Sequence, residues 1–151
     1  MPPTVRSASL DDLPVILALE QRAASAAHWS EDEYERLLRT GLVLVAERAG
    51  QVAGFICAKA AAGEWEIENI VIATEFMRQG IAGRLLRALI EYIAPGTASR
   101  ILLEVRESNH AARRLYEKHG FREVGSRRNY YNNPSEDAIL YEHPGEAEKP
   151  T

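Results

Sequence analysis

The middle of the chain constrains the fold more than any other part, because it has the pattern of a strand, a helix and a second strand. Residues 65–73 are an apolar run with several β-forming side chains, and a segment with two glycines follows them. From Leu85 to Ile93, leucine and isoleucine recur at helical spacing, and residues 100–106 form another apolar run. Two strands joined through a helix are expected to pair locally in parallel. The chain is therefore expected to build a sheet with helices on its faces.

Shorter elements are expected around this unit. Ser9 and Ser30 each begin a capping box, a pattern that opens helices, and Pro95-Gly96 is expected to end the central helix. The other predicted elements are strands at 4–7, 42–48, 52–61, 121–126 and 138–143, helices at 9–24, 30–38 and 109–119, and a polar loop at 127–137. The hairpins among these strands imply antiparallel pairing. The predicted fold class is α/β, with a mixed central sheet flanked by helices.

Length and composition narrow the class of protein. A chain of 151 residues fits a single domain over 1–151, with a core at about 4–143 and a flexible tail at 144–151. One cysteine excludes an intramolecular disulfide, and the scattered histidines show no metal-ligand spacing, so no metal is expected. A net charge of −4 argues against general nucleic-acid binding. The sequence has no apolar run of signal-peptide or membrane-spanning type, so we expect a cytoplasmic protein without a membrane partner.

The turn before the central helix, Arg78-Gln79-Gly80-Ile81-Ala82-Gly83, is a candidate anion site. Glycine lets backbone N–H groups approach a ligand, and a helix N-terminus favours a phosphate or pyrophosphate. Gly-Lys-Ser/Thr and Gly-x-Gly-x-x-Gly are both absent, which excludes a Walker A loop and the dinucleotide-binding fingerprint. Taken alone, the segment is also compatible with a glycine-containing turn that only starts a helix.

A second set of candidates follows on the next strand and helix. Glu104 lies on or near the end of a strand, and Asn109 and Tyr116 are about two helical turns apart, so they share a face. A glutamate and a tyrosine placed together can serve as base and acid. The alternative interpretation is a solvated Glu104 and a Tyr116 in the core. Glu66, Glu68 and Glu136 are further carboxylates that either attract a basic acceptor or belong to the surface.

Together, the two segments resemble the GNAT N-acetyltransferases. The resemblance rests on the turn at 78–83 and on Leu-Glu-Val-Arg-x-Ser-Asn-x-x-Ala-x-x-Leu-Tyr-x-x-x-Gly-Phe at 103–121. Trp29-Ser30-Glu31, Glu68-Asn69-Ile70 and Arg127-Arg128-Asn129-Tyr130-Tyr131 narrow it to the RimI-type ribosomal-protein-alanine N-acetyltransferases. It covers about residues 4–143 and implies the GNAT-type mixed, mostly antiparallel sheet flanked by helices in one domain.

The resemblance also implies roles for individual residues. Glu104 would be the general base, and Tyr116 the general acid that protonates the leaving CoA thiolate. Trp29, Tyr130 and Tyr131 would line the acceptor groove. The residues implied to hold acetyl-CoA are Ile70, Val71 and Ile72 at the pantetheine arm and acetyl group, Arg78, Gln79, Gly80, Ile81, Ala82 and Gly83 at the pyrophosphate, and Asn109.

Two positions depart from the family pattern. Met77 stands where the family usually has Gln or Arg, and Ala73-Thr74 replaces a common Asp-Pro. We expect a side-chain contact to the cofactor to be lost at the first position, although backbone donors do most of the phosphate binding, and we expect the second to change the details of the turn.

The implied function is acetyl transfer from acetyl-CoA to the N-terminal α-amine of a protein, a ribosomal protein beginning with alanine, within a ternary complex. An α-amine has a pKa near 7.7–8 against about 10.4 for lysine, so it loses its proton more readily. The alternatives are the same fold acting on a lysine side chain or a small amine, and a non-catalytic acetyl-CoA sensor. The oligomeric state does not follow from the sequence.

Overall fold

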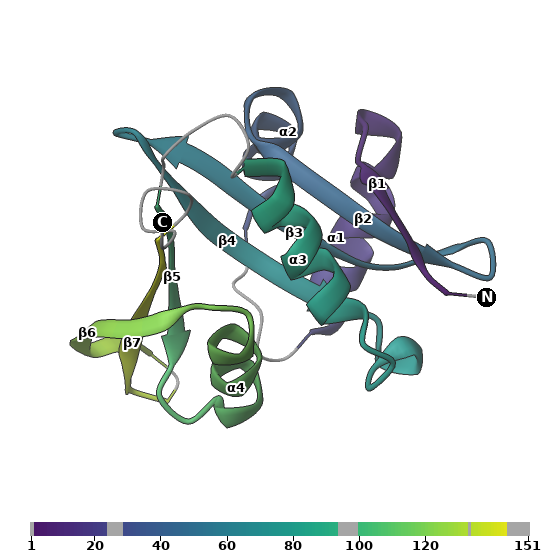
Figure 1. Ribbon diagram of the computed structural model, residues 1–151. Coiled ribbons are helices and arrows are strands. Elements are labelled where there is room, and N and C mark those ends of the chain that lie inside the picture. Colours follow the sequence, from purple (N-terminus) through teal and green to yellow (C-terminus); the bar gives the residue numbers. More distant parts are fainter. Residues whose placement is uncertain (1, 24–28, 94–99, 133, 145–151) are drawn as a thin grey trace, which may run out of the picture.

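The computed structural model describes residues 2–23, 29–93, 100–132 and 134–144 (Figure 1). Its central feature is one seven-stranded sheet with the strand order β1-β2-β3-β4-β5-β7-β6. The strands are β1 (Thr4–Ser7), β2 (Leu42–Arg48), β3 (Gln51–Ala61), β4 (Glu64–Ile72), β5 (Ile101–Arg106), β6 (Arg122–Tyr131) and β7 (Glu136–His143). The helices are α1 (Leu13–Arg22), α2 (Glu31–Thr40), α3 (Ile81–Ile93) and α4 (His110–Lys118), with short 3-10 turns at Leu10–Asp12 and Thr74–Phe76.

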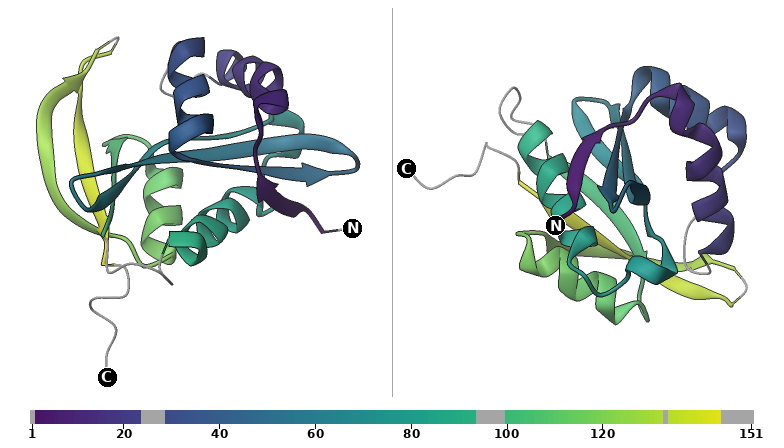
Figure 2. Two further views of the ribbon diagram at one scale, coloured as in Figure 1. Left: turned by 90° about the horizontal axis from the view of Figure 1, so that it is seen from above. Right: turned by 90° about the vertical axis from the view of Figure 1, so that its right-hand side faces the viewer.

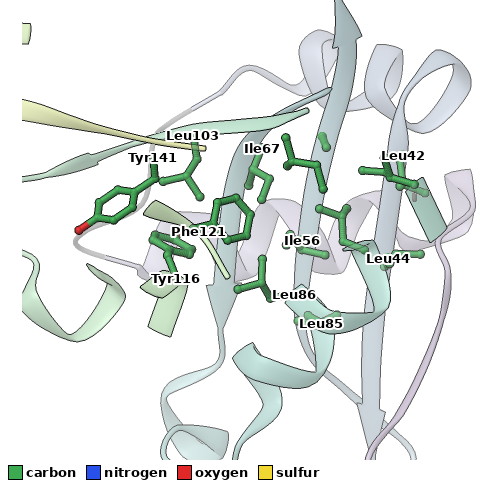
Figure 3. Close-up of a cluster of buried hydrophobic side chains, with 14 of the residues drawn as sticks. Leu42, Leu44, Ile56, Ile67, Leu85, Leu86, Leu103, Tyr116, Phe121 and Tyr141 are labelled. Atoms are coloured by element: carbon green, nitrogen blue, oxygen red, sulfur yellow. The ribbon is translucent and has the colours of Figure 1, made fainter. Parts of the chain in front are cut away.

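Helices cover both faces of the sheet, as Figure 2 shows, with α1 and α2 on one face and α3 and α4 on the other. Each face has its own apolar cluster, because alternate strand residues point to opposite sides. Ile56 of β3 packs in the cluster under α3 and α4, while its neighbour Phe55 packs with α1 and α2. Figure 3 shows part of the first cluster, where Leu85 and Leu86 of α3 lie near Ile56. Burial on both faces explains the long apolar runs of the central strands.

The pairing of β4 with β5 is parallel, as the sequence predicted, but it is short. Only Trp65 with Ile101 and Glu66 with Leu102 are paired. β5 pairs instead with β7 along its whole length, and β4 pairs with β3. Every other strand pair in the sheet is antiparallel. The parallel pair is therefore the place where the sheet opens.

A β-bulge interrupts β4 close to this opening. Cys57 of β3 pairs with Asn69 and the next residue, Ala58, pairs with Ile67, so Glu68 is the extra residue. A bulge changes which face the following side chains occupy. Ile67 packs under α3 and α4, whereas the Asn69 side chain donates to the hydroxyl of Tyr34 in α2 at 3.1 Å, on the opposite face.

The structure confirms the predicted fold class and places most elements within a few residues of the expected ranges. Both capping boxes form, at Ser9 and at Ser30. The first helix ends at Arg22, slightly before the expected end near Ala24. The expected helix end at Pro95-Gly96 and the tail after residue 144 lie outside the described residues. Among the described residues, no helix is long and apolar enough to cross a membrane.

The prediction of a polar loop at 127–137 was wrong. β6 continues to Tyr131 and β7 begins at Glu136, so most of that segment is strand. β6 is an edge strand whose residues are nearly all exposed, so it has no alternating apolar pattern for sequence analysis to detect. Backbone pairing with β7 defines it instead, for example between Arg127 and Ala138.

Candidate active site

A cavity of about 830 Å³ lies where β4 and β5 separate. Its wall combines residues 67–72 of β4, the turn and first residues of α3, residues 103–106 of β5, the start and inner side of α4, and Tyr130 to Asn132. A cavity of this size suits a ligand larger than an amino acid. The opening of the sheet thus brings both predicted sets of residues into one site.

The turn before α3 forms one part of this wall. Arg78, Gly80, Ile81, Ala82 and Gly83 line the cavity. Arg78 has φ 63° and Gly80 has φ 79°, so two residues in this short turn adopt the left-handed conformation. The N–H groups of the first turn of α3 have no acceptor within the helix, and the helix dipole makes this end positive. The turn and helix end together can bind an anion.

Gln79 differs from its neighbours in this turn. Gln79 is absent from the cavity wall. Its side-chain Nε2 lies 3.5 Å from the carbonyl oxygen of Glu75, at the limit of a hydrogen bond. We therefore expect Gln79 to contribute to anion binding through its backbone and not through its side chain.

The edge of β4 forms the next part of the wall. Ile70, Val71 and Ile72 line the cavity beyond the two residues that pair with β5. On its other side this segment of β4 remains paired with β3, through Gly54 with Ile72, Phe55 with Val71 and Ile56 with Ile70. A strand edge without a partner strand presents N–H and C=O groups at regular spacing. An extended ligand can bind along it as an additional strand would.

Glu104 lies on β5 with its side chain on the face of α1 and α2. Its neighbours Leu103 and Val105 pack under α3 and α4, so alternation directs Glu104 the other way. Nε of Arg127 lies 3.2 Å from its Oε1. A hydrogen bond to Glu104 raises the pKa of Tyr130, and the Arg127 guanidinium lies 5.5 Å from the centroid of the Tyr130 ring. β6 therefore holds this carboxylate in place.

Tyr116 lies on α4, on the other face of the sheet. Its residue is 6% exposed, and its ring packs against Phe121 and Tyr141, with centroids 5.8 Å and 6.1 Å away (Figure 3). Burial raises the pKa of Tyr116, so its hydroxyl stays protonated at neutral pH. Tyr116 also lines the cavity. A place in the core and a place in the site are therefore compatible for Tyr116, because it belongs to the apolar cluster and also lines the cavity.

Asn109 lines the cavity but also has a structural role. It is the N-cap of α4, and its Oδ1 accepts from the backbone N–H of Ala112 at 3.2 Å. The side-chain oxygen of Asn109 is therefore engaged in capping α4, while the residue still lines the cavity.

The predicted acceptor-groove residues divide into two groups. Tyr130 and Tyr131 line the cavity, and their rings meet edge to face at 5.1 Å. Burial raises the pKa of Tyr131 to about 12. Trp29 is absent from the cavity wall: it packs with the cluster of α1 and α2, and its backbone N–H donates to Glu20 at 2.6 Å.

Arg106 is a residue to which sequence analysis assigned no role. It lines the cavity, lies 4.4 Å from the Tyr131 ring centroid, and donates to the carbonyl oxygens of Asn132 and Pro134. It also forms an ion pair with Glu136 at 3.3 Å. Arg106 thus ties the β6–β7 turn to β5, and Glu136 serves that attachment rather than an acceptor. The Leu-Glu-Val-Arg segment contains Arg106 and could have drawn attention to it. Its role could not be predicted, because its partners lie about 30 residues away in the sequence.

A family model, curated relatives and a solved structure all indicate the same protein family. Residues 10–121 match the model of the acetyltransferase (GNAT) family. The chain is 37% identical over 144 residues to the ribosomal protein bS18-alanine N-acetyltransferase of Escherichia coli, covering 91% of this chain and 94% of the relative. It is 35% identical to the enzyme of the same name from Haemophilus influenzae, covering 85% and 90%. The crystal structure of the E. coli ribosomal-protein-S18-alanine N-acetyltransferase superposes with a TM-score of 0.86 at 36% identity, covering 95% and 94%.

Proposed function

The chain belongs to the acetyltransferase (GNAT) family, and from this premise we propose that it transfers the acetyl group of acetyl-CoA to the N-terminal α-amine of a ribosomal protein that begins with alanine. The observation that carries the proposal is the cavity at the opening between β4 and β5, which has an anion-binding turn at one part of its wall and Glu104 and Tyr116 at others. The names of the E. coli and H. influenzae relatives support the choice of acceptor.

Acetyl-CoA would bind mainly through the backbone. The pyrophosphate would sit at the turn 78–83, where free N–H groups and the positive end of α3 coincide. The pantetheine arm would extend along the edge of β4 at Ile70, Val71 and Ile72, with Asn109 contacting it from α4. This arrangement directs the thioester toward the point where β4 and β5 separate.

The reaction would then use the groups on the two faces of the sheet. Glu104 would take a proton from the acceptor's amine, directly or through a water, as the amine nitrogen attacks the thioester carbonyl. The carbon–sulfur bond breaks and the thiolate of CoA takes the proton of the Tyr116 hydroxyl. Burial raises the pKa of that hydroxyl, so it stays protonated until the thiolate forms. Backbone N–H groups near Val71 would stabilise the oxyanion that forms in between.

The acceptor preference has a physical basis. The pKa gap between an α-amine and a lysine side chain is about 2.5 units, which corresponds to about 3.5 kcal/mol for removing the proton. A site without a strongly basic group therefore favours α-amines. Tyr130 and Tyr131, which line the cavity, would contact the first residues of the acceptor.

Mass spectrometry of acetyl transfer to a peptide panel tests the proposal. The panel contains basic peptides that begin with Ala, Ser or Met, an N-blocked peptide with one lysine, and polyamines. We expect one acetyl group on the free N-terminus of the Ala-starting peptide and none on the blocked peptide. Transfer to the blocked peptide or to polyamines would move the function to side-chain or small-amine acetylation. Bound acetyl-CoA without any transfer would favour a sensor.

A further inference from the structure

Glu68 is a buried carboxylate in the cavity wall that the proposed mechanism does not use. It is the extra residue of the β4 bulge, and its side chain is only 7% exposed. Oε1 forms an ion pair with Nζ of Lys59 at 3.0 Å. Apart from that contact, Oε1 is buried without a hydrogen bond within the part of the chain that the structure describes. A buried acceptor with spare capacity is costly unless a further donor arrives.

The charges around Glu68 also leave room for a cation. Burial raises the pKa of Glu68, and Glu66 and Glu104 raise it further, while Lys59 acts in the opposite direction. Arg127 is the second cation in this region, and it is paired with Glu104. Three carboxylates thus face two cations, so one more positive charge would balance the group.

The position of Glu68 relates this charge to the chemistry. It directly precedes Asn69 and Ile70 on β4, next to the edge proposed to hold the thioester, and it lines the same cavity as Glu104. An N-terminal amine with a pKa near 7.7–8 is mostly an ammonium at pH 7 and has three N–H donors. It can therefore meet two carboxylates at once.

We propose that Glu68 binds the N-terminal ammonium of the acceptor and so selects the unmodified N-terminus. The inference rests on the proposed function. After the ammonium has lost two protons, one before the attack and one during acetyl transfer, its nitrogen is a neutral amide with a single N–H, and the ion pair with Glu68 no longer exists. Glu68 is thus a substrate-binding residue that favours acceptor over product, while Glu104 takes the proton.

Isothermal titration calorimetry with two peptides tests this role. An Ala-starting basic peptide and the same peptide acetylated at its N-terminus are titrated into the protein saturated with CoA. For the wild type we expect the free peptide to bind about tenfold more tightly, a ratio in the range of one charge-assisted hydrogen bond. Glu68→Gln is expected to reduce that preference to less than about twofold, since it keeps the shape and removes the charge.

Two control variants separate this role from general electrostatics and from folding. Glu66→Gln removes one of the three carboxylates, but Glu66 is absent from the cavity wall and acts on the bound amine only from a distance, so the preference should fall by less than about twofold. Lys59→Met keeps the Glu68 carboxylate without its cation, so the preference should be kept or increased. Thermal unfolding and CoA binding are measured for every variant, and Lys59→Met remains informative if Glu68→Gln does not fold.

The outcomes distinguish this inference from the proposed function. Equal binding of the two peptides by the wild type, or a preference that survives in Glu68→Gln, overturns the role of Glu68. Failure of the wild type to acetylate the free peptide in the mass assay overturns the proposed function instead. Transfer by the wild type together with loss of preference in Glu68→Gln alone supports both.

Discussion

The residues that line the cavity form two groups, and the groups are built in different ways. One group, which we call the backbone wall, consists of Ile70 to Ile72 of β4 and residues 78 and 80–83 of the turn, and we propose that it binds mainly through N–H and C=O groups. The other group, the side-chain wall, consists of Glu68, Glu104, Tyr116, Tyr130 and Tyr131, and it offers carboxylates and phenols from both faces of the sheet. The contrast implies different sensitivities: the backbone wall depends on conformation, whereas the side-chain wall depends on the identity of single residues.

The largest effect is expected from Tyr116→Phe on the side-chain wall. Phenylalanine keeps the ring packing against Phe121 and Tyr141 and removes only the proton donor. We expect kcat to fall about 10²- to 10³-fold, the usual contribution of a general acid. Steady-state kinetics and calorimetry of acetyl-CoA binding measure the two parts separately. Unchanged turnover in Tyr116→Phe would contradict the general-acid role of Tyr116 and the sensitivity expected of the side-chain wall.

Glu104→Gln is expected to have the next largest effect. Glutamine keeps a hydrogen-bond acceptor for Arg127 but cannot take a proton at neutral pH. We expect kcat/KM for the acceptor peptide to fall about 10²-fold, with the affinity for acetyl-CoA unchanged. The matched variant is Glu123→Gln. It removes a carboxylate of β6 that forms an ion pair with Arg113 of α4, and it should leave the kinetics unchanged. A rate kept by Glu104→Gln would assign proton removal to another group.

On the backbone wall, Gly80→Ala is expected to weaken acetyl-CoA binding without a direct steric clash. A Cβ at Gly80 would meet nothing within 4 Å, but φ is +79°, a conformation that costs an alanine about 1 kcal/mol. Relaxation of the turn should therefore raise the KM for acetyl-CoA about fivefold.

Gly50→Ala is the matched control for that prediction. Gly50 lies between β2 and β3, with φ +76° and equally open space around it. The substitution should lower the free energy of unfolding by a similar amount and leave the KM for acetyl-CoA unchanged. A rise in KM in both variants would show that the effect is general destabilisation rather than a property of the backbone wall.

The smallest effect is expected from Gln79→Ala. The Gln79 side chain lies outside the cavity wall, and its backbone is kept by the substitution. We expect the KM for acetyl-CoA to change by less than about twofold, as for other surface substitutions. A larger loss in the kinetic assay would mean that a side chain takes part in the backbone wall, and the contrast between the two walls would weaken.

Much of the fold was predictable because local patterns and tertiary structure agree. Ser30 and Glu33 form the expected capping box, and the helix at 81–93 follows its apolar spacing. The polar strand β6 was not predictable, because an edge strand exposed on both faces carries no apolar alternation. Trp29 was predicted at the acceptor groove; the structure packs it against the cluster of α1 and α2, and its role at the groove stays a prediction.

The site was predictable only in part. Sequence motifs predicted Glu104, Tyr116 and the turn at 78–83, and all of these except Gln79 line one cavity, while their roles stay predictions. Glu68 was one of three carboxylates for which the sequence left a role at the acceptor or a place on the surface open, and Arg106 had no predicted role. A bulge and contacts between distant segments bring both to the same cavity. Neither a bulge nor such a contact has a sequence period that identifies it.

The sequence by itself determined the order of strands and helices, the glycine turn, and the residues available for acid–base chemistry, because periodicity, caps and side-chain types are local properties. The tertiary structure alone decided that β4 and β5 pair over only two residues and then separate. It also decided that Glu104 and Tyr116 approach the resulting cavity from opposite faces of the sheet. Strand separation depends on the packing of both faces and on the pairing of β5 with β7, which no single segment of the chain encodes.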